Sequence, residues 1–155
     1  MIKIERITKN EIDKLNNLLQ LYLHDLSLYF PITFNNDSCL YEYDNIEKYV
    51  EEMYNYAYFI INDGNIIGFS LINENKEQIV MQEMFILNNY KKKGYGKEAV
   101  FKIFNNHNGN WIVKVVPNSK KAENFWLKTI NEYTNGNYSL EHTRKYKRAE
   151  FNFRN

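Results

Sequence analysis

The residues best suited to chemistry lie between Glu83 and Lys97, where an apolar run ends in lysines and glycines. The turn reads Lys91-Lys92-Lys93-Gly94-Tyr95-Gly96-Lys97, and apolar residues at helical spacing follow it. Backbone amides at a helix start have no intrahelical partner and bind anions, assisted by the helix dipole. Glycine allows a phosphate to approach the backbone closely. The pattern therefore predicts a phosphate-binding turn, to which four lysines add positive charge.

Two common phosphate-binding motifs do not fit this segment. A Walker loop requires Gly-Lys-Ser/Thr at a fixed interval after a first glycine, and the dinucleotide fingerprint requires three glycines near a first strand. The alternative that stays open is an ordinary turn between a strand and a helix, with solvated lysines.

Glu83 is the candidate general base of the chain. A carboxylate in a partly buried cleft can have a raised pKa and accept a proton from an ammonium through a water molecule. We expect Glu83 and Phe85 to share the cleft side of their strand. The alternative is a structural glutamate bonded to a neighbouring strand or helix. His24, beside Asp25, is a weaker candidate, because a histidine on a helix surface usually has no catalytic role.

The elements that must position these residues follow from periodicity and turn signals. A capping box at Thr8–Glu11 precedes a helical stripe that ends at Leu26. Residues 31–44 are expected to form a loop, and the Asp63-Gly64 pair predicts a β-hairpin. Strands are predicted at 2–7, 58–61, 66–72, 79–87, 111–116, 138–142 and 148–153, and further helices at 46–53, 94–104 and 122–130. The order β-α-α-β-β-β-α-β-α-β-β predicts a single α/β domain over residues 1–155.

Composition excludes several classes of protein. The chain has 155 residues, of which 44% are hydrophobic and 25% charged, as in globular proteins. Its single cysteine, Cys39, excludes an intramolecular disulfide framework and a cysteine-based zinc site. The apolar runs are shorter than the roughly 20 residues of a membrane span, and the charged N-terminus does not resemble a signal peptide. We therefore expect a cytoplasmic protein with no metal and no membrane partner.

Charge is distributed unevenly along the chain. Residues 1–90 carry 6 Lys/Arg and 14 Asp/Glu, whereas residues 91–155 carry 14 Lys/Arg and 5 Asp/Glu. One interpretation is a cationic substrate on one side and a phosphate-rich ligand on the other; the alternative is two solvated surfaces. The basic segment Arg144–Arg148, with Tyr146 inside it, has a composition that suits RNA. We interpret it as a turn between two strands and do not expect nucleic-acid binding.

The sequence resembles the GNAT superfamily of acyl-CoA-dependent N-acetyltransferases. The segment Lys91–Gly96 matches the Arg/Gln-x-x-Gly-x-Gly signature with lysine in its first position, and Glu83–Ile86 with Tyr90 match the usual strand and lead-in. Residues 117–126 resemble the later Asn-x-x-Ala-x-x-Phe-Tyr stretch. The Tyr-rich first helix, with residues 40–43, is also similar to a bacterial group of predicted acetyltransferases. The order of elements matches over the whole chain.

The resemblance implies a fold and a co-substrate. The sheet would be mixed and mostly antiparallel, with helices on both faces and a central parallel pair of strands splayed into a V. Acetyl-CoA would lie in the V, its pantetheine on the strand backbone and its pyrophosphate on the amides of residues 92–97. The implied acetyl-CoA contacts are Met84, Phe85, Ile86, Lys91, Lys92, Lys93, Gly94, Tyr95, Gly96, Lys97, Asn118, Ser119, Phe125 and Trp126. No metal is implied.

The resemblance also implies a reaction, namely acetyl transfer to a primary amine of a small molecule or peptide by direct attack in a ternary complex. It places Tyr22, Tyr29, Tyr41 and Tyr43 at the acceptor pocket. Three positions depart from the family pattern, and one of them is Lys114, which lies where some relatives carry a glutamate base. The usual asparagine falls on Ser119, with Asn118 beside it, and the tyrosine that often protonates the leaving thiolate is replaced by Trp126. The second hypothesis is therefore a catalytically degenerate acyl-CoA-binding regulatory module, and the third an RNA-associated protein. We expect a monomer or homodimer.

Overall fold

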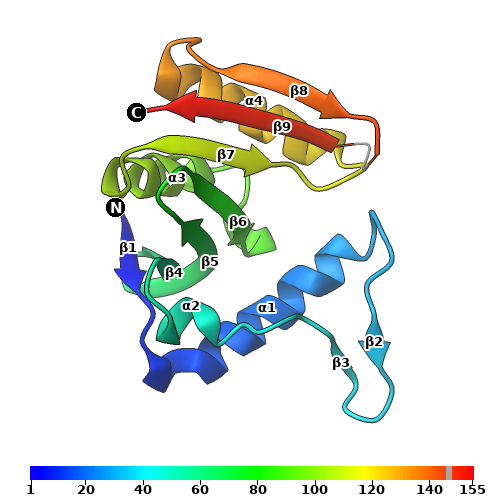
Figure 1. The fold of residues 1–155 in the computed structure, drawn as a ribbon. Helices are drawn as coiled ribbons and strands as arrows, with labels where there is room; N and C mark the ends of the chain where they lie inside the picture. The colour runs from blue at the N-terminus through cyan, green and yellow to red at the C-terminus, as the bar shows by residue number, and fades with distance from the viewer. Residues whose placement is uncertain (146–147) are drawn as a thin grey trace.

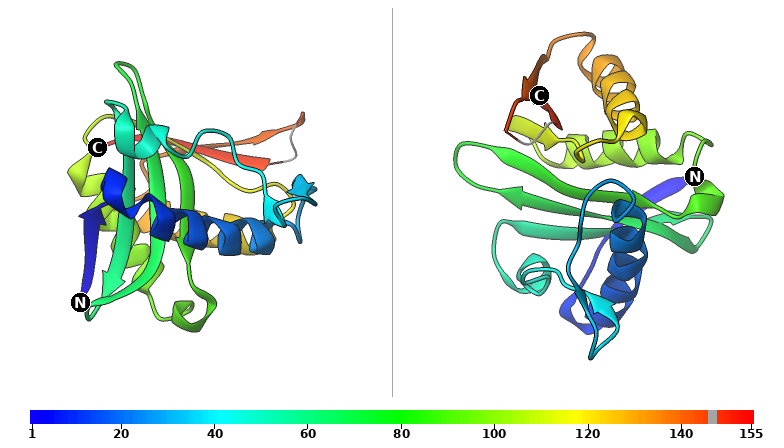
Figure 2. Two further views of the ribbon diagram at one scale, coloured as in Figure 1. Left: turned by 90° about the horizontal axis from the view of Figure 1, so that it is seen from below. Right: turned by 90° about the vertical axis from the view of Figure 1, so that its right-hand side faces the viewer.

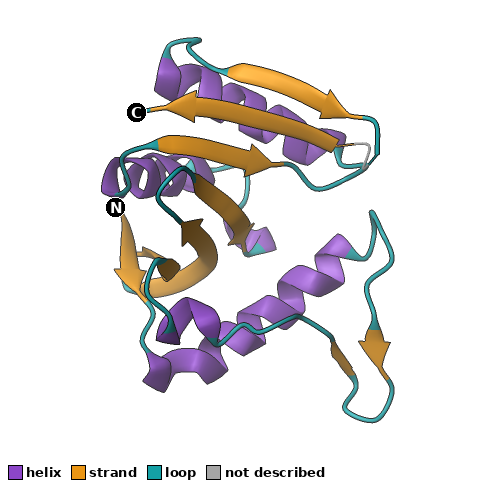
Figure 3. Ribbon diagram, viewed as in Figure 1, coloured by secondary structure: helices purple, strands orange, loops and turns teal. Residues whose placement is uncertain are grey.

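The structure is a computed structural model that describes residues 1–145 and 148–155. Tyr146 and Lys147, from the basic segment noted in the sequence, lie outside the described residues. The strands are β1 (Ile2–Arg6), β2 (Phe34–Asn35), β3 (Leu40–Tyr41), β4 (Asn55–Asn62), β5 (Asn65–Glu74), β6 (Ile79–Ile86), β7 (Asn110–Lys114), β8 (Ser139–Thr143) and β9 (Arg148–Arg154). The helices are α1 (Ile12–Leu26), α2 (Lys48–Glu51), α3 (Tyr95–Asn106) and α4 (Lys120–Thr134), with 3-10 turns η1 (Lys9–Glu11) and η2 (Asn88–Tyr90) (Figures 1 and 3).

The main sheet has the topology that the resemblance implied. In the described part of the chain, seven strands form one sheet in the order β1-β4-β5-β6-β7-β9-β8. Neighbouring strands are antiparallel, apart from the parallel pair β6 and β7. Helix α1 packs on one side of the sheet, and α3 and α4 pack on the other (Figure 2). The prediction of a mixed, mostly antiparallel sheet between helices is confirmed.

The parallel strands β6 and β7 separate shortly after they begin. Their register joins Ile79–Met81 to Trp111–Val113 and continues no further, although β6 runs on to Ile86. Beyond Met81 the two strands diverge, and the predicted V-shaped pair is confirmed (Figure 1). The second half of β6 therefore has one edge on β5 and the other edge directed away from it.

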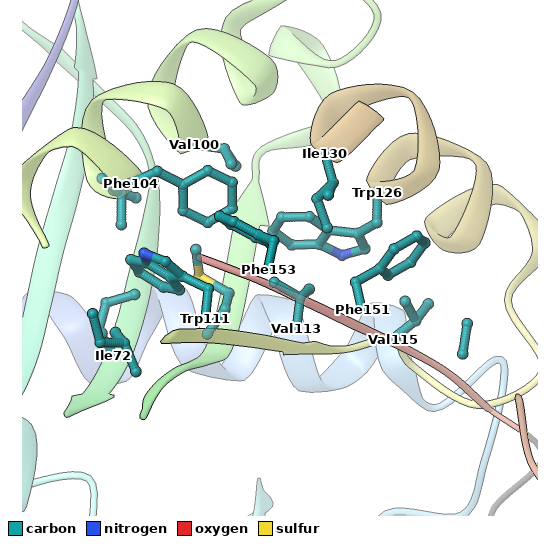
Figure 4. Packing of buried hydrophobic residues seen from close by; sticks show 14 of the residues in the cluster. Ile72, Val100, Phe104, Trp111, Val113, Val115, Trp126, Ile130, Phe151 and Phe153 are labelled. Atoms are coloured by element: carbon teal, nitrogen blue, oxygen red, sulfur yellow. The ribbon is translucent and has the colours of Figure 1, made fainter. Parts of the chain in front are cut away.

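Two apolar layers hold the helices on the sheet. One layer packs α1 against β4, β5 and β6 through residues such as Leu15, Leu19 and Phe69. The other lies between α3, α4 and the strands β7 and β9, and Figure 4 shows Trp111, Phe104, Trp126 and Phe151 within it. Each fully buried side chain of this size contributes about 1.5–3 kcal/mol of hydrophobic stabilisation. These layers position both α1 and the start of α3 relative to β6.

Local signals in the sequence account for several boundaries. The capping box is present, because the Glu11 carboxylate accepts a hydrogen bond from the Thr8 backbone N–H at 3.2 Å, although the first turn is a 3-10 turn. Asp63 and Gly64 both have positive φ, as the predicted hairpin turn requires. The expected loop 31–44 instead contains the two-residue strands β2 and β3, a two-stranded sheet of its own. A strand of two residues is too short to show the alternation of apolar and polar residues by which strands are predicted from sequence.

Candidate active site

Glu83 lies on β6 just beyond the point where β6 leaves β7, and two tyrosines hold its carboxylate. Tyr22, from α1, donates a hydrogen bond to Glu83 Oε2 at 2.5 Å. Tyr43, from the chain after β3, donates to Oε1 at 3.1 Å. The Tyr22 ring also packs edge-on against Phe69, with 5.7 Å between centroids. Residues far apart in sequence thus fix both oxygens of one half-buried carboxylate.

The surroundings of Glu83 change its acidity. Burial raises the pKa of Glu83 to about 7, even though the hydrogen bonds from Tyr22 and Tyr43 lower it. Burial and the Glu83 charge in turn raise the pKa of both tyrosines, so the two hydroxyls stay protonated donors. At neutral pH both the ionised and the protonated forms of Glu83 are therefore populated.

An irregularity in β6 sets the direction of Glu83. Leu71 of β5 pairs with Glu83 and the next residue, Ile72, pairs with Met81, so Gln82 is an extra residue on β6. A bulge of this kind redirects side chains near functional sites. Glu83 and Phe85 then face α1, where Tyr22 contacts both, with 5.6 Å between the Tyr22 and Phe85 ring centroids. The Glu83 backbone is also fixed, because its carbonyl accepts a hydrogen bond from the Ser70 hydroxyl at 3.0 Å.

The free edge of β6 carries backbone groups suited to an extended ligand. Leu87 N–H bonds to Ile67 O of β5 at 2.8 Å. Because successive residues of a strand direct their backbone groups to opposite sides, Phe85 also faces β5, whereas Met84 and Ile86 face the diverging side. Of the three predicted pantetheine contacts on this strand, Met84 and Ile86 therefore have backbone groups directed into the V.

The turn before α3 has the geometry of an anion-binding helix start. Gly94 precedes the helix with φ of +83°, and Lys92 also has positive φ. A Cβ built on Gly94 meets no atom within 4 Å, so the space beside this backbone is open to solvent or to a ligand. The first N–H groups of α3, beginning at Tyr95, have no acceptor within the helix. Together these features fit a phosphate group.

Gly96 serves a different purpose from Gly94. It lies inside α3, and a Cβ placed there would come within 3.3 Å of Phe125 Cε2 and 3.6 Å of Ile86 Cγ1. Glycine at this position therefore permits the Phe125 ring of α4 to rest on α3. A larger residue at Gly96 would therefore require the Phe125 ring to move.

The four lysines of the turn have different partners. Lys91 bonds to Asn88 Oδ1 at 2.6 Å and reaches Asp25 of α1 at 3.4 Å. Lys97 forms an ion pair with Glu132 of α4 at 2.9 Å. Lys92 and Lys93 are exposed, and the Lys93 ammonium lies 5.8 Å from the centre of the Tyr90 ring. Exposed charges of this kind are screened by salt and contribute little each.

The residues between 118 and 126 that the resemblance implied as acetyl-CoA contacts mostly have structural roles. The Ser119 hydroxyl caps α4 by accepting the Ala122 N–H at 3.1 Å. Asn118 donates to the Tyr29 carbonyl at 3.1 Å, which ties the loop after β7 to the end of α1. Trp126 is 7% exposed and lies in the core layer of Figure 4, with Phe125 against it at 5.2 Å between ring centroids.

Sequence reasoning missed the roles of Tyr22 and Tyr43. Both belonged to the group of tyrosines expected at the acceptor pocket, but nothing in the sequence showed that they bond to Glu83. Tyr22 sits on the apolar stripe of α1, where it is indistinguishable from a core residue. The weaker base candidates bond elsewhere, since His24 Nδ1 lies 2.9 Å from the Tyr41 hydroxyl and Asp25 pairs with Lys91.

A diverging parallel strand pair, an anion-binding helix start and a strand carboxylate together define the architecture of an acyl-CoA-dependent acyltransferase. Residues 17–130 match the acetyltransferase (GNAT) family. This match covers well over half of the sequence, so the chain belongs to the GNAT acetyltransferase family. No curated protein matches the chain in sequence.

Solved structures share the fold at low sequence identity. An acetyltransferase from Thermus thermophilus superposes with a TM-score of 0.73 at 11% identity, covering 100% of this chain and 97% of that one. A Bacillus subtilis acetyltransferase in complex with CoA has a TM-score of 0.63 at 13% identity, with coverage of 100% and 99%. A GNAT acetyltransferase from Elizabethkingia anophelis with acetyl-CoA bound has a TM-score of 0.57 at 11% identity, with coverage of 99% and 98%.

Neither a metal-binding cluster nor a membrane-spanning helix is found among the residues that the structure describes. Groups of three or more His, Cys, Asp or Glu side chains that could hold a metal ion do not occur within residues 1–145 and 148–155. In the same part of the chain, none of the helices has the length and apolar character needed to cross a membrane.

Proposed function

We propose that this protein transfers the acetyl group of acetyl-CoA to a primary amine, and that Glu83 is the general base. The observation that carries the proposal is a half-buried carboxylate that Tyr22 and Tyr43 hold beside the point where β6 and β7 diverge. Burial at this point raises the pKa of Glu83 to about 7. General bases work best when their pKa lies near the operating pH. An amine reaches the site mostly as an ammonium, so a base must remove a proton before attack.

The donor would lie along the free edge of β6. Pantetheine would bond to the backbone of Met84 and Ile86, and the pyrophosphate would rest on the amides that begin α3. The open space beside Gly94 supports this placement, because a phosphate can approach that backbone without meeting a side chain. The remaining contacts implied by the family resemblance stay predictions for this chain.

The reaction would proceed by direct attack in a ternary complex. The amine loses a proton to Glu83 through a water molecule, and its nitrogen forms a bond to the thioester carbon. Backbone N–H groups on the diverging side of β6, those of Met84 and Ile86, stabilise the developing oxyanion. The carbon–sulfur bond then breaks, the nitrogen releases its second proton to solvent, and CoA leaves as a thiolate that takes a proton from solvent. Trp126 is not the acid, because an indole N–H does not ionise in this range.

Two measurements test the proposal together. At a concentration about 100-fold above its dissociation constant, acetyl-CoA should stabilise the folded protein by roughly 2.7 kcal/mol in thermal unfolding. Acetyl-CoA with a panel of primary amines should release free CoA thiol. Stabilisation without thiol release from any amine would instead support the alternative function, a regulatory module that binds acyl-CoA without turnover. No stabilisation at millimolar acetyl-CoA would contradict both.

A further inference from the structure

The chain that carries Tyr43 is held on α1 by the side chain of Gln20. The Gln20 amide nitrogen donates to the Tyr41 carbonyl at 2.9 Å, and Gln20 Oε1 accepts the Tyr41 backbone N–H at 2.8 Å. One side-chain amide thus satisfies both backbone groups of Tyr41, as a residue of a neighbouring strand would. This arrangement fixes the backbone of Tyr41 in position as well as in direction.

Tyr43 follows this clamp by two residues, and its hydroxyl donates to Glu83 at 3.1 Å. The strands β2 and β3 pair with each other and do not extend the main sheet, so the main sheet does not set the position of this segment (Figure 1). One helical turn after Gln20, His24 shares a hydrogen bond with the Tyr41 hydroxyl, but at an exposed site. One face of α1 therefore binds the segment, while Tyr22, on another face, binds Glu83 directly.

We propose that Gln20 is a positioning residue for acetyl transfer, because by holding the Tyr41 backbone on α1 it keeps the Tyr43 hydroxyl on Glu83. This inference rests on the proposed function of Glu83 as the base. A hydroxyl directed at Glu83 stabilises its ionised form, which is the form that accepts a proton. Without the clamp, Tyr43 moves away and a smaller share of Glu83 is ionised at neutral pH.

A competing explanation is that Tyr49, and not Gln20, holds the Tyr43 hydroxyl on Glu83. This buried residue of α2 lies close enough to Tyr43 to influence its acidity. If Tyr49 alone positions Tyr43, Gln20 merely attaches an exposed segment to α1. The two explanations differ in what a change at Gln20 does to the carboxyl of Glu83.

The deciding experiment is a carbon-13 NMR titration of glutamate carboxyl groups in the full chain, with Glu83 assigned by its absence in Glu83→Gln. Gln20→Ala and Tyr43→Phe should each raise the pKa of Glu83 by about one unit, the effect of one charge-assisted hydrogen bond. The double variant should raise it no further, since both changes remove the same contact. Asn17→Ala, an exposed position on the same helix, is the matched control and should leave the pKa unchanged.

Kinetics supply a second measurement, namely thiol release from acetyl-CoA with the most active amine of the panel. Gln20→Ala should lower kcat about 5-fold at pH 7, recover at pH 9, and leave the KM for acetyl-CoA unchanged. An unchanged Glu83 pKa in Gln20→Ala would overturn the proposal in favour of Tyr49. A fall towards 4.5 would overturn it too, by showing that Gln20 only excludes water. If the wild type acts on no amine, the proposed function fails, yet the titration still decides the role of Gln20.

Discussion

The hydroxyl of Tyr22 on α1 donates a 2.5 Å hydrogen bond to Oε2 of Glu83 on β6. A hydroxyl that donates to a carboxylate oxygen stabilises the ionised form of that carboxylate. The contact couples the position of α1 to the acidity of the candidate base, because Tyr22 counteracts the burial that raises the Glu83 pKa. Loss of the Tyr22–Glu83 bond should therefore change the acidity of Glu83.

Tyr22→Phe should raise the pKa of Glu83 above 7, since a bond that favours the ionised form is lost while burial remains. A shift of about one unit reduces the ionised fraction at pH 7 about 5-fold, and the rate of acetyl transfer should fall equally. Above pH 9 the variant and the wild type should converge. Tyr54→Phe, at an exposed tyrosine, is the control. A loss of rate that is the same at every pH would show that Tyr22 acts through packing alone.

Glu83→Gln should lower kcat at pH 7 by about 10²–10⁴-fold, the usual contribution of a general base. The amide keeps the shape of the side chain but cannot take a proton. The defect should shrink towards pH 10, where the amine arrives already deprotonated, and the affinity for acetyl-CoA should change little. Glu77→Gln, at an exposed loop position, should match the wild type. Full activity of Glu83→Gln across the pH range would exclude Glu83 as the base.

The same substitution should stabilise the fold above neutral pH. The folded-state pKa of Glu83 is raised from 4.5 to about 7, so the folded protein holds a proton that the unfolded chain releases between these values. Stability is therefore lost as pH rises through this window, and above it the buried charge costs roughly 3 kcal/mol. Chemical unfolding should show Glu83→Gln gaining up to that amount at pH 8 and nothing below pH 4.5. If Glu83→Gln differed from the wild type in stability by the same amount at pH 8 and below pH 4.5, ionisation of Glu83 would carry no cost in the folded protein.

Substitutions at Gly94 and Gly96 should separate donor binding from folding. Gly94→Ala meets no neighbour, so it should cost only about 1–2 kcal/mol for its positive φ but should weaken acetyl-CoA binding. Gly96→Val must displace the Phe125 ring, and it should cost about 1–3 kcal/mol of stability. Thermal unfolding with and without acetyl-CoA measures both effects. Phe125→Leu should partly rescue Gly96→Val, and the absence of any rescue would show that the ring is not the obstacle.

The sequence alone determined the features that depend on neighbouring residues. The capping box at Thr8, the hairpin at Asp63-Gly64 and the glycine before α3 each follow from the conformational preferences of a few adjacent residues. The order of strands and helices follows from periodicities of the same local kind. These features were sufficient to indicate the family, because its signature lies in one strand, one turn and one helix start.

Only the tertiary structure decided which side chains meet. Tyr22 and Glu83 are separated by 61 residues and Tyr43 and Glu83 by 40, so no spacing rule connects them. Gly96 and Phe125 likewise meet only because α3 and α4 pack on the same face of the sheet. The acidity of Glu83 also depends on this assembly, since burial by elements distant in sequence, and not any adjacent residue, raises its pKa.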